Sequence, residues 1–192
     1  EVLVAESARL EQLAREFATL GRLPEGPSAE VDLGELLAEL LRTSLPGTMT
    51  SSLEVAPDTP AVLGHYDPLR RAFGNLLRNA VEACQGREAA GSGSGEAGAC
   101  RIDARVSRDG NAVIVALADH GPGIPRDKRR RVFEPYFTDK PDGTGLGLAL
   151  VKQAIDLHRG TITLSETPGG GATFTVRLPV TDDRGARGER TA

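Results

Sequence analysis

The stretch "DGTGLGLAL", from Asp142 to Leu150, places three glycines at alternate positions directly before an apolar run. The first amides of a helix have no partners within the helix and carry a partial positive charge, so they can bind phosphate when no side chain blocks the approach. Gly143, Gly145 and Gly147 leave that approach open. A tight turn usually needs only one glycine. The stretch therefore predicts a helix over residues 144–158 whose start binds phosphate, with a plain turn as the alternative.

The neighbouring segments predict two hairpins and a long helix. Apolar and polar residues alternate over 100–107 and 112–119 around the turn sequence "RDGN". The same alternation occurs over 160–166 and 172–180 around "TPGGG". Residues 67–84 carry apolar side chains at helical spacing, which predicts a helix with one face in the core.

The first half of the chain adds elements to the same domain. A helix is expected to begin after Asp32 as its N-cap and to end near Pro46, and short strands are expected at 51–55 and 61–66. Asp67 is the expected cap of the long helix. This order of elements predicts an α+β fold, a two-layer α/β sandwich in which a mixed sheet is covered on one face by helices.

The remaining segments read as connections and ends. Residues 1–22 repeat apolar side chains every seven positions, which predicts a helix that pairs with another helix or folds onto its own domain. Residues 23–30 contain prolines and glycines and predict a linker, and 85–99 predict a flexible loop. The basic run at 126–131 predicts a short exposed helix, and 181–192 predict a disordered tail.

The composition favours a domain of a cytoplasmic protein. The 192 residues include 23 basic and 27 acidic side chains, so no broad cationic face for nucleic acid is expected. No apolar run approaches the roughly 18 residues that cross a bilayer, and we expect a piece of a longer chain that could itself be anchored in a membrane. Cys84 and Cys100 are too few for a disulfide framework, so we expect two small core residues in a reducing compartment.

Three polar side chains complement the glycines. Asn75 and Asn79 are four residues apart, so both lie on one face of a helix. Amide oxygens suit Mg²⁺, which takes its negative charge from nucleotide phosphates. Two surface asparagines are the alternative. Asp119 ends a predicted strand before a glycine-rich turn, where its carboxylate could accept a hydrogen bond from an exocyclic amino group such as that of adenine.

Four motifs resemble those of sensor histidine kinases, in the same order. "NLLRNA" at 75–80, "DHGPGI" at 119–124, "VFEPYFT" at 132–138 and "GTGLGLAL" at 143–150 are similar to the N, G1, F and G2 boxes of that family. The resemblance covers residues 31–180 and is strongest to nitrogen-regulation sensors of the NtrB and NtrY type. It implies the Bergerat ATP-binding sandwich shared with DNA gyrase and MutL. No Walker P-loop motif is present.

The resemblance implies a site for ATP and Mg²⁺. It assigns Asn79 to the metal, Asp119 to the adenine amino group and Thr173 to a water between that carboxylate and adenine. Lys140, in a short lid at 138–142, is either a γ-phosphate contact or a solvated loop charge. The nucleotide contacts implied in full are Asn75, Asn79, Asp119, Gly121, Gly123, Ile124, Lys140, Gly143, Thr144, Gly145, Leu146, Gly147, Leu148 and Thr173.

The resemblance also implies phosphoryl transfer to a histidine, followed by relay to a response-regulator receiver domain. In hydrolysing relatives such as gyrase and MutL a glutamate stands at the position of Asn75, and an amide is a poor base. The acceptor histidine would lie in a dimerisation hairpin that makes the parent a homodimer, with residues 1–22 as the second helix. We expect His65, His120 and His158 to be structural, the last as a cation that is favourable at the end of a helix.

Three alternatives stay open at this point. The first is an ATPase of the gyrase or MutL type, which Asn75 and the short lid argue against. The second is a non-catalytic nucleotide-sensing or scaffold domain, which the intact motifs argue against. The third is a serine-directed kinase resembling anti-sigma factors, which usually lack the leading helix. One departure from the family is "NAVEA" at 79–83, which lacks the basic or aromatic residue often found after the N box.

Overall fold

A five-stranded mixed sheet forms one layer of the domain. The computed structural model describes residues 27–47, 49–89, 101–140 and 143–180. The strands lie in the order β2-β4-β5-β7-β6, with β2 parallel to β4 and every other pair antiparallel. Their bounds are Thr50–Val55 (β2), Arg101–Asp109 (β4), Ala112–Asp119 (β5), Thr161–Glu166 (β6) and Ala172–Pro179 (β7). The predicted mixed sheet and both predicted hairpins are therefore confirmed.

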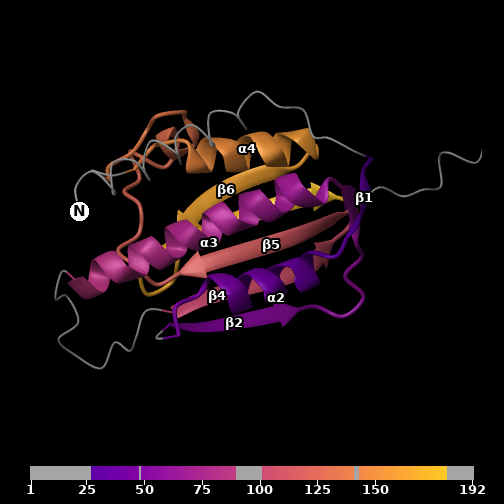
Figure 1. The fold of residues 1–192 in the computed structure, drawn as a ribbon, viewed down its shortest axis with the longest axis horizontal. Helices are drawn as coiled ribbons and strands as arrows, with labels where there is room; N and C mark the ends of the chain where they lie inside the picture. The colour runs from indigo at the N-terminus through magenta and orange to yellow at the C-terminus, as the bar shows by residue number, and fades with distance from the viewer. Residues whose placement is uncertain (1–26, 48, 90–100, 141–142, 181–192) are drawn as a thin grey trace, which may run out of the picture.

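Three helices cover one face of this sheet (Figure 1). They are α2 (Leu33–Ser44), α3 (Tyr66–Ala89) and α4 (Gly147–Leu157). Alternate residues of β4, such as Ile102 and Val106, are buried beneath the helices. The core of α3 includes Phe73, Leu76 and Leu77, which are at most 1% exposed. Burial of such side chains is the main source of stability in a domain of this size. The predicted two-layer sandwich is confirmed.

The predicted start of α2 is confirmed in detail. The Asp32 carboxylate accepts hydrogen bonds from the amides of Gly34 and Glu35, at 2.8 and 3.0 Å. These bonds satisfy two of the amides that a helix leaves without partners at its start. A cap of this kind contributes about 1 kcal/mol to stability.

The structure differs from the prediction before α3. Part of the expected linker forms strand β1 (Ala29–Val31), which pairs antiparallel with β3 (Val62–Gly64) in a separate two-stranded sheet. Val31 and Val62 are 3% and 2% exposed, and this burial holds the short pair in place. The strand expected at 61–66 therefore ends early, and Tyr66 begins α3, which leaves Asp67 in the first turn rather than at the cap.

Other boundaries also differ. Helix α3 continues through Ala89, five residues into the expected loop. The basic run at 126–131 forms turns, followed by the short 3-10 helix η1 (Arg131–Phe133), because it has no apolar stripe to bury. Helix α4 begins at Gly147 rather than at 144, because Gly145 takes a φ of 69° that a right-handed helix cannot include.

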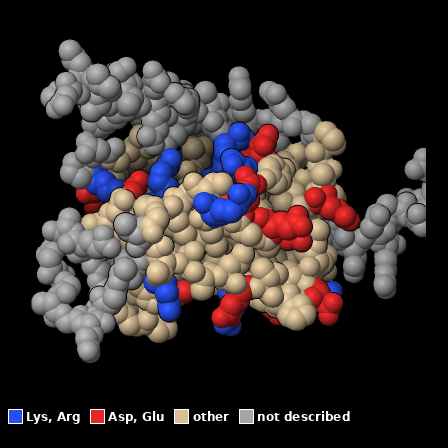
Figure 2. Space-filling model, turned by 60° about the horizontal axis from the view of Figure 1, so that its bottom comes forward, with Lys and Arg blue, Asp and Glu red and all other residues tan. Residues whose placement is uncertain are grey.

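Several predictions lie partly or wholly outside the described residues. These are the heptad-patterned segment, the start of the expected linker, most of the expected loop at 85–99, the end of the lid at 138–142, the tail after residue 180 and Cys100. Cys84 is buried as expected but is disulfide-bonded, so the prediction of a reduced cysteine is wrong there, since one bridge needs no larger framework. On the face drawn in Figure 2, basic and acidic side chains lie intermixed. Within the described ranges, no helix is long and apolar enough to cross a membrane.

Candidate functional site

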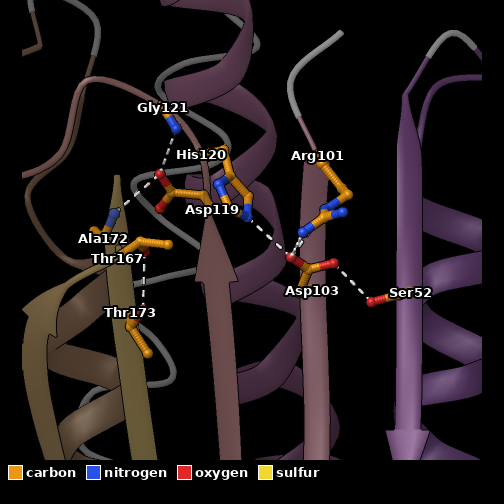
Figure 3. Close-up of polar contacts among 9 residues, drawn as sticks. All are labelled: Ser52, Arg101, Asp103, Asp119, His120, Gly121, Thr167, Ala172 and Thr173. Carbon is orange, nitrogen blue, oxygen red and sulfur yellow. Dashed lines mark hydrogen bonds and ion pairs between the residues drawn. The ribbon is translucent and has the colours of Figure 1, made fainter. Parts of the chain in front are cut away.

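Asp119 lies at the end of β5 and is 3% exposed. Its Oδ1 accepts hydrogen bonds from the amides of Gly121 and Ala172, at 2.9 and 3.2 Å (Figure 3). Burial raises the pKa of the Asp119 carboxyl, and the two backbone hydrogen bonds act in the opposite direction. Because both bonds go to one oxygen, the other oxygen can accept from a ligand.

Glycines bring two loops against this aspartate. Gly171 has a φ of 115°, and a Cβ atom there would lie 1.9 Å from the Asp119 carbonyl oxygen. Gly123 has a φ of 77°, and its Cβ position lies 2.9 Å from the Gly171 carbonyl oxygen. The loop after β5 and the β6–β7 turn therefore meet backbone to backbone. The sequence motifs indicate Gly121 and Gly123 but not Gly171, whose signal is the run of three glycines at 169–171.

Thr173 lies beside Asp119 on the neighbouring strand, as Figure 3 shows. It pairs in register with Ala118, and its hydroxyl lies 2.8 Å from that of Thr167. Thr167 is 4% exposed and was not predicted, because no motif marks it. The two hydroxyls can satisfy each other and hold a water beside the carboxylate.

Helix α3 joins this region to the glycine-rich turn. Near its middle, Asn75 Nδ2 donates to the Gly147 carbonyl oxygen at 3.3 Å. Two turns later, the Cβ atom of Ala83 lies 3.0 Å from the Cβ position of Gly121. Eight residues of helix span about 12 Å. Asn79 lies halfway between these contacts and is half-buried, and its amide has no hydrogen bond to any described residue.

The glycine-rich turn leads into an open helix start. Gly145 is packed so closely that a Cβ atom there would lie 2.5 Å from the backbone of Tyr136. The Tyr136 amide donates to the Gly145 carbonyl oxygen at 2.9 Å. Helix α4 has no side-chain cap and no acidic residue in its first turn. Its first amides therefore face the site without an internal anion.

The other residues that were predicted to contact the nucleotide could do so only through their backbone, or they pack within the fold. Leu146 is fully buried, so only its amide could reach a ligand, and that amide donates to Thr144 Oγ1 at 3.3 Å. Leu148 and Ile124 pack against the core. The Cβ position of Gly143 lies 2.3 Å from Thr138 Oγ1, so a larger residue there would have to displace the Thr138 side chain.

Charged side chains surround the start of α4. Arg78 Nη2 donates to Asn75 Oδ1 at 2.8 Å and lies 3.6 Å from the Cβ position of Gly147. Lys140, at the lid, forms an ion pair with Glu82 of α3. Arg78 and Glu82 were not predicted as site residues, although their spacing from Asn75 places all three on one helix face.

All three histidines make contacts within the fold. His158 Nε2 accepts from the His65 amide at 2.8 Å, and Nδ1 donates to the Ala154 carbonyl oxygen at 2.7 Å. Burial lowers the pKa of His158, so the expectation of a helix-end cation is wrong. His120 Nε2 lies 2.9 Å from Asp103 (Figure 3).

Asp103 is the centre of a polar cluster next to the end of β5, where Asp119 lies. Ser52 Oγ donates to Asp103 Oδ1 at 2.6 Å, and Arg101 Nε donates to Oδ2 at 2.9 Å. Burial raises the pKa of the Asp103 carboxyl, but hydrogen bonds from Ser52, His120 and Arg101 outweigh it and leave the pKa lowered. The cluster ties β2, β4 and the end of β5 together, and so fixes the backbone that carries Asp119.

The site thus has a carboxylate acceptor at one end, and at the other it has two cations near a helix start that no side chain caps. This arrangement suits a ligand that has an amino group and a polyanion about 12 Å apart, the span of eight helical residues. Residues 64–182 match the family model described as "Histidine kinase-, DNA gyrase B-, and HSP90-like ATPase". The match includes every residue that the site contains.

Relatives and solved structures agree with this match. The C4-dicarboxylate transport sensor protein DctB of Rhizobium meliloti (strain 1021) is 37% identical over 165 residues, 85% of this chain and 25% of that protein. The nitrogen regulation protein NtrY of Azorhizobium caulinodans is 30% identical over 183 residues, 93% of this chain and 22% of that protein. The structure of the mycobacterial sensor histidine kinase MprB has a TM-score of 0.66 and 28% identity, and covers 79% of this chain and 97% of its own.

The chain spans about a quarter of the length of these two relatives, so it corresponds to one part of such a protein. The matched region contains α3, α4 and strands β4 to β7, and with them the glycine-rich turn and the α3 asparagines. The chain belongs to the family of histidine kinase-, DNA gyrase B- and HSP90-like ATPases and is similar to one part of sensor histidine kinases.

Proposed function

We propose that this domain binds Mg²⁺–ATP along α3 and transfers the γ-phosphate to a histidine in the dimerisation domain of its parent chain. One observation carries the proposal. The same helix contacts the glycine-rich turn through Asn75 and the Asp119 loop through Ala83. A single nucleotide can therefore reach both ends of the site.

The base would bind at the Asp119 end. The Asp119 oxygen that has no backbone partner would accept from the adenine amino group, and Thr173 with Thr167 would hold a bridging water. Gly121 and Gly123 would allow the backbone to pass close to the ring. Because these groups are fixed by hydrogen bonds before a ligand arrives, little ordering entropy is lost on binding.

The metal would bind at Asn79. Its half-buried amide has no protein partner among the described residues, and its oxygen is a ligand type that Mg²⁺ accepts together with water and phosphate. Bound there, Mg²⁺ would neutralise charge on the phosphates. The triphosphate would extend towards the amides of Gly145 and Gly147, since the Gly143 amide already donates to the Lys140 carbonyl oxygen at 3.1 Å, and the Lys140 side chain would approach the γ-phosphate.

The surroundings of Asn75 favour transfer over hydrolysis. Both ends of its amide have partners, since Nδ2 donates to Gly147 and Oδ1 accepts from Arg78. An amide held in this way cannot accept a proton from water. The site therefore positions and neutralises the phosphates, and an external nucleophile must attack. A histidine supplied by another domain fits this requirement.

The partners follow from this function. We propose that the parent is a homodimer through its acceptor domain, that the acceptor passes the phosphate to a response-regulator receiver domain, and that the catalytic domain works in the cytoplasm, where ATP is available. The proposal includes no nucleic-acid partner. A membrane anchor of the parent would lie in another part of that protein.

The test is phosphotransfer in trans. The 192-residue chain is incubated with γ-labelled ATP and Mg²⁺, alone and with a purified dimerisation hairpin taken from the parent protein. The expected label appears on the hairpin, is stable in base and is lost in acid, as phosphohistidine is. Rapid phosphate release by the chain alone would instead indicate an ATPase of the gyrase type. Tight ATP binding without label or phosphate release would indicate a sensing domain.

A further inference from the structure

Two cations share one carboxylate at the phosphate end of the site. Glu82 Oε2 pairs with Lys140 of the lid, and Glu82 Oε1 lies 4.0 Å from Arg78 Nε. Arg78 also reaches Asn75 and the first residue of α4, Gly147. The side chains of Arg78, Glu82 and Lys140 are 45%, 41% and 50% exposed, so a ligand can reach all three.

Among these three described side chains, positive charge exceeds negative charge. Arg78 and Lys140 contribute two positive charges and Glu82 one negative charge, and the start of α4 adds a partial positive charge with no acidic residue in its first turn. Glu82 lies between the two cations, and each of its oxygens faces one of them. Two oxygens of a phosphate can contact the same pair of cations in the same way.

We propose that the Glu82 carboxylate occupies the position of a nucleotide phosphate when no ATP is bound. It pairs with Arg78 and Lys140 in that state, and a phosphate of ATP replaces it on both cations when ATP binds. This inference rests on the proposed nucleotide site and adds Arg78 to its phosphate contacts. It also assigns a role to the turn after the N box, where an acidic residue stands in "NAVEA". Glu82 is a positioning residue here, because it acts through the two cations.

The proposal predicts that Glu82 lowers nucleotide affinity by an amount that depends on the number of phosphates in the nucleotide. ATP and ADP must displace Glu82 from its cations, whereas AMP places no phosphate there. Exposed ion pairs contribute little, so removing the competitor should strengthen binding by only about two- to fivefold. Glu82→Gln keeps the shape and removes the charge. We expect it to tighten ATP and ADP by that factor and to leave AMP unchanged.

A matched control separates this effect from net charge. Glu54 of β2 forms an exposed ion pair with Arg105 at 2.6 Å, at the edge of the sheet. Glu54→Gln removes the same charge from the same kind of pair and should change no nucleotide affinity. Thermal midpoints of both variants check that the fold is intact.

The experiment measures dissociation constants of ATP, ADP and AMP in Mg²⁺ by calorimetry for the 192-residue chain. Lys140→Gln should weaken ATP, and Glu82→Gln should tighten ATP less in that background than alone. An unchanged ATP-to-AMP ratio, or weaker ATP binding, in Glu82→Gln overturns the inference. Asp119→Asn serves as the test of the site itself. If it weakens all three nucleotides while Glu82→Gln has no effect, only this inference fails, and if it weakens none, the site assignment fails.

Discussion

Replacing Asp119 by asparagine tests the base end of the site most directly. The carboxylate uses Oδ1 for the Gly121 and Ala172 amides and keeps Oδ2 for a ligand. Asparagine can keep the oxygen that accepts the two backbone bonds. It then presents an NH₂ group where Oδ2 was, so a donor faces the amino group of adenine.

The expected loss follows from this exchange. A hydrogen bond to a charged group contributes about 1.5 to 3 kcal/mol, and Asp119 is only 3% exposed, so water cannot replace the bond. ATP affinity should therefore fall by about tenfold to a hundredfold. Inosine triphosphate carries an oxygen acceptor instead of the amino group, so the new NH₂ group should favour it. The variant should lose much of the parent's preference for ATP over inosine triphosphate.

The assay is competition of each triphosphate against a fluorescent ATP analogue, with urea unfolding as a check on the fold. Burial raises the pKa of Asp119, so the folded state holds the proton more tightly than the unfolded state. The ionised group therefore costs stability at neutral pH, and the variant should be at least as stable as the parent there. As the pH falls through the raised pKa, the parent should gain stability relative to the variant. Unchanged ATP affinity in a folded variant would refute the assignment of Asp119.

Three further predictions concern the turn, the metal and pH. Gly171→Ala should destabilise the fold by about 3 kcal/mol or more, because its Cβ atom would lie 1.9 Å from a backbone oxygen. Gly169→Ala, at a φ of 86° with nothing within 4 Å, should cost only about 1–2 kcal/mol in urea unfolding. Asn79→Ala should remove the Mg²⁺ dependence of ATP affinity, whereas Asn75→Ala should keep it. Calorimetric titrations with and without Mg²⁺ measure this dependence. If Asn79→Ala retains it, the metal binds elsewhere. Burial lowers the pKa of His158, so its contribution to stability is complete above about pH 6.5 and is lost as the pH falls below it, at up to about 1.4 kcal/mol per pH unit. His158→Gln should flatten that slope in urea titrations between pH 8 and 5.5, and an unchanged slope would contradict the neutral tautomer.

The sequence predicted the parts of this fold that depend on local pattern. Asp32 caps α2 because a cap needs only the residues that follow it. The two hairpins form around their glycine-containing turns for the same reason. The four motifs predicted the family, and their residues lie along α3, at and after the end of β5, around η1, and in the turn and first residues of α4.

Features that depend on distant segments were missed. Strand β1 forms because Val31 pairs in register with Val62 of β3 and both side chains become buried, although 30 residues separate them in the chain. The Glu82 and Lys140 pair depends on where the lid lies over α3, which no periodicity encodes. Thr167 is a buried hydroxyl whose only signal is its partner on the next strand. Such contacts become visible only when the whole chain is folded.

The position of β7 within the sheet has a consequence for synthesis of the protein. This strand is the last one described, yet it lies between β5 and β6 rather than at an edge. It also supplies the Ala172 amide that holds Asp119. Residues up to 179 must therefore leave the exit tunnel of the ribosome before β7 can pair with β5 and β6. A growing chain shorter than this cannot form the complete site around Asp119.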